Sequence, residues 1–247
     1  MPSVGSVDLR ALISELANRT KLGRTEADVQ SGIKVLLLAA PLNLSENELD
    51  DQSILLEAQA GFRRRIDIEV GATVIEVKKN LKIGKVREEA VIQLAAYVAH
   101  RAETVGRRYV GVLTDGADWH LYSLDQTALR LVSSFEIENA ANPNVEGLLV
   151  WLEGVLATTS RVHPTPKEIE KRLGAKSSGH QLDSTDLAAL YHLYRDKASV
   201  MLKRELWGRL LTTALGTAFE DSDELFVNHT LLVLEAEIIA HAVIGYD

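Results

Sequence analysis

The chain has no cysteine among its 247 residues, which excludes a disulfide framework, a thiolate metal site and a cysteine nucleophile. It also has no uncharged apolar run approaching the roughly 20 residues that a membrane-spanning helix needs. The N-terminus lacks a basic segment followed by an apolar one, so it does not predict a secretory signal. These absences indicate a cytoplasmic protein without a membrane partner.

Several motifs of common enzyme classes are missing as well. The sequence has no GxxxxGK[ST] phosphate loop, no GxGxxG dinucleotide motif, no GxSxG nucleophile turn and no paired-histidine zinc spacing. What remains is the composition of a folded protein, with 46% apolar and 25% charged residues. The seven histidines are scattered singly and are interpreted as surface or core residues.

Charge is unevenly distributed along the chain. The net charge is −8, yet residues 61–108 contain eleven Lys and Arg against six Asp and Glu, a local net charge of +5. A basic segment inside an acidic chain is what a focused site for a polyanion such as DNA would look like, and an ordinary solvated surface is the alternative interpretation. We expect Arg63, Arg64, Arg65, Lys82 and Lys85 to contact phosphates and to position the nucleic acid without reading its sequence.

Hydrophobic periodicity and turn residues predict an α/β domain over residues 1–160, with a mixed β-sheet flanked by helices. The first clear helix begins at the capping box of Thr25 and Asp28 and stops at Pro41. Further helices are expected over residues 85–106 and 145–156. Strands are expected over residues 54–58, 64–70, 73–79, 109–113, 119–123 and 129–137.

The remaining residues predict a helical segment after a linker. Residues 161–182 form the expected linker, with a short helix from Pro166 to Gly174 and a loop over residues 176–181. Residues 183–247 are expected to be a helical connector, with one long amphipathic helix running from Asp186 to Met201 and another from about residue 224. We expect the chain to continue beyond residue 247 into a further domain.

The informative motif lies in a predicted hairpin. If Gly71 and Ala72 form its turn, Asp67 faces Glu76 across the two strands, and Arg65 faces Lys78. Like charges placed directly opposite each other destabilise a sheet unless something compensates them. A divalent cation would do so, and hard carboxylate oxygens favour Mg²⁺, with Mn²⁺ as a substitute.

The residues of this hairpin predict a phosphodiesterase site. Asp67, Glu76 and the backbone carbonyl of Val77 are the expected metal ligands. Lys78 is placed to hold or activate a water molecule and to neutralise charge that develops on the phosphate. Glu26 could add a further acid from the preceding helix, and Gln93 with Tyr97 share one face of the following helix. Salt bridges on an exposed hairpin are the alternative interpretation.

In this order the motif resembles the PD-(D/E)xK nuclease superfamily, in which a helix with Glu, a strand with Asp, a strand with ExK and a helix with QxxxY follow one another. The resemblance covers residues 20–156 and is closest to the nuclease domains of type I restriction subunits and of fused restriction-modification enzymes. It implies a restriction-endonuclease-like fold, double-stranded DNA as the substrate, and homodimerisation for cutting both strands. The matching residues here are Glu26, Asp67, Glu76-Val77-Lys78, Gln93 and Tyr97.

The resemblance extends to residues 186–247, which are similar to the connector before the methyltransferase domain of such fused enzymes. It implies methyltransferase and target-recognition domains beyond residue 247, because no NPP[YFW] motif or S-adenosylmethionine glycine loop occurs in this sequence. The expected function is that of a Mg²⁺-dependent restriction endonuclease domain. The alternative is a nuclease fold without activity that docks on DNA or serves assembly.

Three other acids are interpreted differently. Asp115 belongs to a Thr-Asp-Gly turn between two predicted strands and Asp118 follows it, so we interpret both as turn residues instead of metal ligands. Glu69 shares a strand face with Asp67 and could support the metal ligands from behind. Lys79 points away from Lys78 on an ideal strand and is not counted as catalytic.

Overall fold

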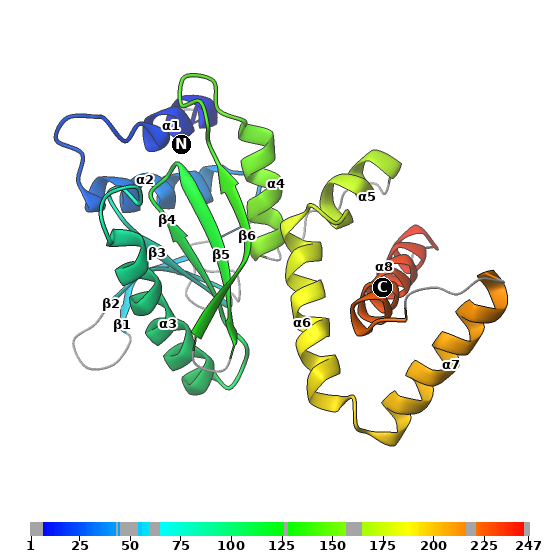
Figure 1. Ribbon diagram of the computed structural model, residues 1–247. Coiled ribbons are helices and arrows are strands. Elements are labelled where there is room, and N and C mark those ends of the chain that lie inside the picture. The colour runs from blue at the N-terminus through cyan, green and yellow to red at the C-terminus, as the bar shows by residue number, and fades with distance from the viewer. Residues whose placement is uncertain are drawn as a thin grey trace. The chain divides into compact units, whose positions relative to one another are not determined.

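The computed structural model describes residues 7–42, 44, 54–59, 65–125, 128–156, 165–215 and 221–244, and for residues 54–59, 65 and 242 the backbone alone. The chain forms two compact units, residues 1–161 and 162–247. The first unit holds a sheet with helices around it, and the second is helical (Figure 1). This architecture confirms the predicted mixed sheet flanked by helices.

Six strands form one sheet in the order β1-β2-β3-β4-β5-β6. Neighbouring strands are antiparallel except β3 and β4, which are parallel. A parallel pair needs a crossover connection, and helix α3 (Val86–Val105) provides it. As a result β3 lies inside the sheet, between β2 and β4. The strands are β1 (Ile54–Gln59), β2 (Arg65–Val70), β3 (Thr73–Val77), β4 (Val110–Thr114), β5 (Asp118–Asp125) and β6 (Ala128–Glu136).

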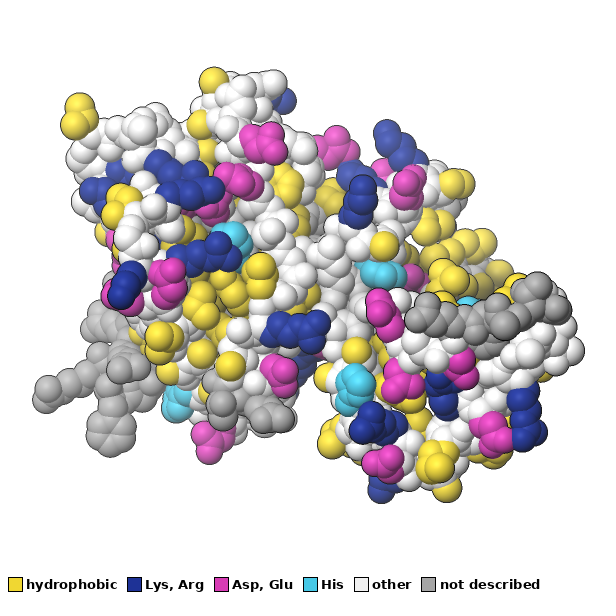
Figure 2. All heavy atoms as spheres, viewed as in Figure 1, with side chains coloured by type: hydrophobic (Ala, Val, Ile, Leu, Met, Phe, Trp, Pro, Cys, Tyr) yellow, Lys and Arg dark blue, Asp and Glu magenta, His cyan; other side chains and the backbone are white. Residues whose placement is uncertain are grey.

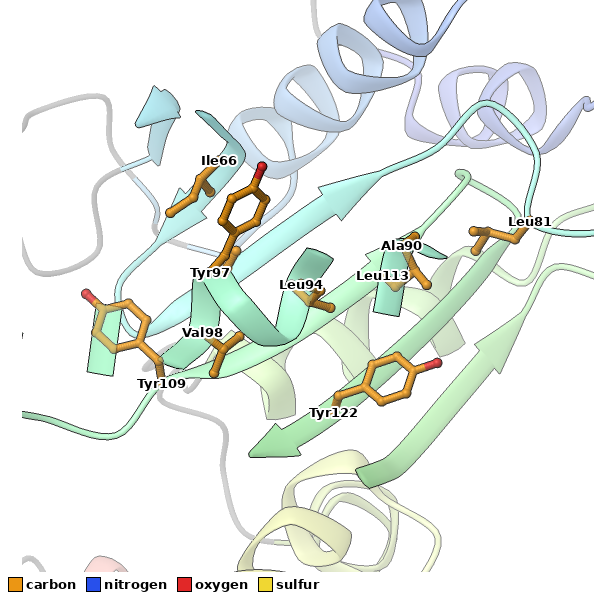
Figure 3. Packing of buried hydrophobic residues seen from close by; sticks show 10 residues of the cluster. Ile66, Leu81, Ala90, Leu94, Tyr97, Val98, Tyr109, Leu113 and Tyr122 are labelled. Atoms are coloured by element: carbon orange, nitrogen blue, oxygen red, sulfur yellow. The ribbon is translucent and has the colours of Figure 1, made fainter. Parts of the chain in front are cut away.

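Helices cover both faces of the sheet, so β3 and β4 are buried along their whole length. On one face Leu94 of α3 packs against the sheet (Figure 3). A Cβ atom on Gly111 of β4 would lie 2.9 Å from that leucine side chain. On the opposite face Trp119 meets Trp151 of α4 (Val145–Leu156), with ring centroids 6.4 Å apart. The parallel pair thus forms the centre of the core.

Two helices precede the sheet. Helix α2 (Glu26–Ala39) begins at the predicted capping box, in which Thr25 and Asp28 bond each other's backbone. Helix α1 (Leu9–Ala17) was not expected from the sequence, although its buried residues Ile13, Leu16 and Ala17 have helical spacing, because they span little more than one turn. It is held by tertiary packing, with Leu16 against Gly32 of α2.

The second unit differs from the prediction at two points. Its helices are α5 (Pro166–Leu173), α6 (Ser178–Tyr194), α7 (Ala198–Leu215) and α8 (Asp223–Ile244). The expected loop over residues 176–181 is wrong, because Ser177 caps α6 by accepting a hydrogen bond from the His180 N–H group. The expected continuous helix from Asp186 to Met201 is also wrong, because a turn at residues 195–197 separates α6 from α7.

The apolar spacing continues across that turn at Ala198 and Met201, but both side chains are exposed, so the spacing there does not mark a buried helix face. Both helices instead contact α8 through aromatic rings. Tyr191 of α6 and Trp207 of α7 each lie 5.3 Å from the ring of Phe226 in α8. Among the described helices of both units, none combines the length and the apolar character that crossing a bilayer would require.

Candidate active site

The candidate site forms where β3 ends inside the sheet. Glu76 is fully buried and pairs with Leu113 of β4, which packs under α3, so its side chain is on the α3 face. Lys78 follows the last residue of β3, and its N–H group donates a hydrogen bond to the Thr114 carbonyl at 2.9 Å. The Nζ atom of Lys78 lies 2.5 Å from Oε1 of Glu76. The parallel pairing thus fixes both members of the ExK motif.

Asp67 joins this site from β2. The ladder between β2 and β3 pairs Ile68 with Ile75 and has the predicted register, but it ends before reaching Asp67 and Glu76. There, Oδ2 of Asp67 accepts a hydrogen bond from the Val77 N–H group at 2.8 Å. The carboxylate of Asp67 therefore replaces a backbone carbonyl, which orients it toward the end of β3.

The predicted pair of Arg65 and Lys78 is not part of the ladder. The backbone of Arg65 pairs with Gln59 of β1, and Lys78 lies beyond the end of β3, although the sequence predicted a strand up to residue 79. The side chain of Arg65, like Arg63 and Arg64 as a whole, lies outside the described residues. Their predicted phosphate contacts stay predictions.

The first turn of α2 supplies the third acid. Oε1 of Glu26 lies 3.5 Å from Nζ of Lys78, so the lysine bridges two carboxylates. One turn later, Gln30 donates a hydrogen bond from Nε2 to the Asp67 carbonyl at 2.7 Å. Sequence reasoning missed Gln30, although its spacing of four residues from Glu26 places both on one helix face. This face of α2 therefore holds both β2 and Lys78.

The surroundings shift the protonation of the two central groups in opposite senses. Burial, together with the charges of Asp67 and Glu26, raises the pKa of Glu76 to about 7, even though Lys78 opposes the shift. Burial alone would lower the pKa of Lys78, but its hydrogen bond with Glu76 and the nearby carboxylates raise that pKa above 10.5. Lys78 is therefore a cation at neutral pH. The carboxyl group of Glu76 is only partly ionised there, because the nearby positive charge does not fully offset its burial and the neighbouring acids.

The unsatisfied chemistry of this site fits a divalent cation. Oε2 of Glu76 is buried and has no hydrogen-bond partner among the described residues. A buried carboxylate oxygen without a partner is costly and calls for a ligand. Val77, whose carbonyl oxygen is the third predicted ligand, is the last residue of β3. In the described part of the chain no three His, Asp or Glu side chains already form a preassembled metal cluster.

Gln93 and Tyr97 lie on α3, the helix that covers the Glu76 face. Nε2 of Gln93 donates a hydrogen bond to the Tyr97 hydroxyl oxygen at 2.8 Å, as their spacing of four residues permits. Tyr97 is 3% exposed and packs beside Ile66 of β2 (Figure 3). The pair thus fixes α3 against the strand that carries Asp67, which suits the predicted orienting role.

The basic residues after Lys78 behave differently from one another. Lys82 is engaged, since its Nζ lies 2.9 Å from Oε1 of Glu136 and 3.3 Å from Oδ2 of Asp118. Lys85 is exposed directly before α3 and has no ion pair among the described residues. Figure 2 shows Lys and Arg side chains gathered at the end of the sheet where α3 begins, with acidic side chains among them. Of the two lysines, Lys85 is the one available to a phosphate.

The other acids have structural partners. Oε1 of Glu69 accepts hydrogen bonds from Arg101 at 2.6 Å and from the Tyr109 hydroxyl at 3.0 Å, while its Oε2 is buried without a partner among the described residues. Asp115 lies in the predicted turn between β4 and β5, where its Oδ1 accepts from the N–H group of Asp118. The turn interpretation of Asp115 is confirmed, with Gly116 at a φ of 85°. No model of a known protein family matches the chain, and no curated protein or solved structure shows significant similarity to it.

Proposed function

We propose that the first unit is a Mg²⁺-dependent DNA endonuclease domain of the restriction type, with the PD-(D/E)xK site on a restriction-endonuclease-like fold. The observation that carries this proposal is the convergence of Asp67, Glu76 and Lys78 at the end of one buried strand, with one oxygen of Glu76 left without a partner. Duplex DNA is the proposed substrate and the cytoplasm the proposed location.

Each residue has a role that follows from its surroundings. Asp67, Glu76 and the carbonyl of Val77 would hold Mg²⁺, which supplies an activated water molecule and neutralises phosphate charge. The ammonium group of Lys78 donates hydrogen bonds to the water and to a phosphate oxygen, because its raised pKa keeps it charged. Glu26 holds Lys78 from the side of α2. We propose that two copies pair to cut both strands.

Replacing the buried glutamate tests this function directly. Glu76→Gln should abolish Mg²⁺-dependent cleavage, because an amide cannot act as an anionic ligand. The measurement is the conversion of supercoiled plasmid DNA to nicked and linear forms by the full chain, with Mg²⁺ or with EDTA. Glu89→Gln, an exposed change on α3, is the control that should retain wild-type cleavage.

The result has three distinct meanings. Cleavage that Mg²⁺ supports and Glu76→Gln abolishes agrees with the proposal. Cleavage by Glu76→Gln at the same rate as by Glu89→Gln would contradict the assigned role of Glu76. A wild-type chain that binds duplex DNA yet never cuts it would favour the alternative, a nuclease fold that docks on DNA or serves assembly.

The two lysines near α3 should differ in their effect on DNA binding. Lys85→Ala should weaken duplex binding and reduce the slope of log affinity against log salt by about 0.9, the loss of one phosphate contact. Lys82→Ala should leave that slope nearly unchanged, because Lys82 is already paired with Glu136 and Asp118. Fluorescence anisotropy of a labelled duplex at several salt concentrations measures both slopes. Equal slopes for the two variants would remove the phosphate contact from Lys85.

A further inference from the structure

Helices α7 and α8 of the second unit expose a large apolar surface. Eleven of their Leu, Ile, Val and Met side chains are between 43% and 69% exposed. At about 100 Å² each, they expose about 1,100 Å² together, whereas the largest apolar patch on a typical monomer covers about 300 to 600 Å². Surface of this kind marks a place where another molecule binds.

Helix α7 has no buried residue along its whole length. Its exposed Leu202, Leu206 and Leu210 follow one another every four residues and form one apolar row. The contact with α8 is made by another side of the helix, where Trp207 meets Phe226. Most of the stability of a protein helix comes from packing of its apolar face. On α7 the row of leucines is that face, and it lies outside the contact with α8.

Helix α8 is apolar on more than one side. Its buried Val227 and Leu231 share a side with Glu235, which pairs with His180 of α6. Residues 232–234 are Leu, Val and Leu, all exposed, and consecutive residues of a helix point about 100° apart. A helix with apolar side chains all round belongs in the interior of an assembly. Helix α6 covers one side of α8, so another molecule is needed for the others.

The charges of the two helices are opposite in sign. Helix α7 carries three Lys and Arg against one Glu, whereas α8 carries four Asp and Glu and no Lys or Arg. Part of this charge is neutralised within the unit, where Arg204 pairs with Asp223. Lys203 of α7 and Glu237 of α8 are exposed and have no ion pair among the described residues. The surface thus holds both members of an ion pair that the unit itself does not form.

We propose that this surface binds a second copy of the chain, with α7 of each copy on α8 of the other. A two-fold pair covers both helices with surface that each copy already has, and it brings Lys203 of one copy to Glu237 of the other. The exposed apolar surface exceeds the about 800 Å² that each partner of a standard interface buries. An anionic membrane surface fits less well, because it would repel the acids of α8.

The interface belongs to the second unit and needs neither DNA nor Mg²⁺. It gives a surface to the proposed pairing of two copies, yet it stands even if the proposed cleavage fails. Analytical ultracentrifugation of the full chain, without DNA or Mg²⁺, therefore tests it separately from the nuclease activity. The mass should rise with concentration from 27.2 kDa to twice that value, with a dissociation constant on the order of 1 µM.

Two results of this measurement would overturn the proposal. One is a full chain that stays monomeric at about 100 µM, well above the expected dissociation constant. The other is a mass that keeps rising beyond two copies, because a two-fold pair is closed.

Substitutions at exposed positions should break the pair without disturbing the fold. Leu206→Glu and Ile238→Glu should each raise the dissociation constant at least about a hundredfold, because each places one charge per copy in the apolar interface. Ile92→Glu, the same kind of change at a 72% exposed position of α3, should leave it unchanged. Circular dichroism should be the same for all three variants. A pair that tolerates both Leu206→Glu and Ile238→Glu would lie elsewhere in the chain, contrary to the proposal.

Charge reversal tests whether α7 of one copy meets α8 of the other. Lys203→Glu and Glu237→Lys should each weaken the pair by about tenfold, because like charges then face each other across the interface. The combined variant Lys203→Glu/Glu237→Lys should regain the wild-type dissociation constant, since it forms the same ion pair with reversed polarity. A combined variant that pairs more weakly than either single variant would show that these residues do not meet and would overturn the proposed arrangement.

Discussion

Replacing Lys78 by alanine is expected to reduce Mg²⁺-dependent cleavage of duplex DNA by about a hundredfold to a thousandfold. The side chain removed is a protonated amine 2.5 Å from Glu76 and 3.5 Å from Glu26, at the place where a phosphate would gain charge. Water cannot replace an oriented ammonium group there without reorganising during the reaction. The loss should therefore appear in kcat, with only a small change in KM.

The same variant should remain folded. Without Lys78 the carboxyl group of Glu76 would be a buried anion, but its pKa of about 7 already allows it to take up a proton near neutral pH. The site can thus become neutral without unfolding. Circular dichroism and the melting temperature should consequently stay close to those of the wild type.

Lys79→Ala is the matched control. Lys79 is the next residue, is exposed, and has no ion pair among the described residues. The Lys79→Ala substitution removes one positive charge from the same segment as Lys78→Ala does, and it should leave kcat unchanged. Single-turnover cleavage with excess protein measures the chemical step for both variants. A folded Lys78→Ala protein that cuts at the wild-type rate would exclude the lysine from the reaction, and comparable losses in both variants would reduce its role to general charge.

Local features of the hairpin could be predicted from the sequence because they depend on neighbouring residues. The turn at Gly71 fixes the register of β2 and β3, and the capping box at Thr25 makes Glu26 the first residue of α2. The acids of the hairpin and Glu26 were therefore placed correctly along their elements. The distance between Glu26 and Lys78 was not predictable, because it depends on how α2 packs against the sheet.

Other features depend on contacts between distant residues. The parallel pairing of β3 with β4 buries Glu76, and nothing near Glu76 in the sequence indicates it. The close fit of Leu94 over Gly111 and the pairing of Arg19 with Asp115 likewise join segments that are far apart in the chain. A sequence pattern records periodicity within an element, and the partner of that element is set by the packing of the whole unit.

Asp115→Asn is expected to lower the free energy of unfolding by about 3 kcal/mol, the low end of the range for breaking a buried ion pair, because Arg19 is partly exposed. Asp115 is fully buried. Its Oδ2 also accepts the Leu81 N–H group at 2.9 Å, and its Oδ1 accepts that of Ala117 at 3.1 Å. An asparagine amide offers one acceptor oxygen and turns two donors toward these N–H groups and the guanidinium.

The acid dependence of stability identifies the charge as the cause. Burial by itself would raise the pKa of Asp115, but hydrogen bonds from Arg19 and from the backbone of Asp118 and Leu81 hold the pKa below 3.8. A carboxyl group with a depressed folded-state pKa contributes its stability above the unfolded-state value of about 3.9. That contribution is lost as pH falls below this value through the folded-state pKa. The difference between the wild type and Asp115→Asn should therefore be largest near neutral pH and shrink in acid.

Urea unfolding at several pH values measures this difference. Asp125→Asn, an exposed change at the end of β5, should unfold like the wild type throughout. A constant difference between Asp115→Asn and the wild type down to acidic pH would mean that packing, and not charge, is responsible.

The same variant distinguishes a structural role of Asp115 from a role as a metal ligand. Through Leu81, Asp115 holds the segment between Lys78 and α3, and through Arg19 it holds the end of α1. Neither contact brings its carboxylate to Glu76. At a temperature well below its own melting point, Asp115→Asn should therefore keep at least about a tenth of the wild-type kcat, whereas Glu76→Gln should keep none. Complete loss of cleavage in a fully folded Asp115→Asn protein would instead place the metal at the turn between β4 and β5.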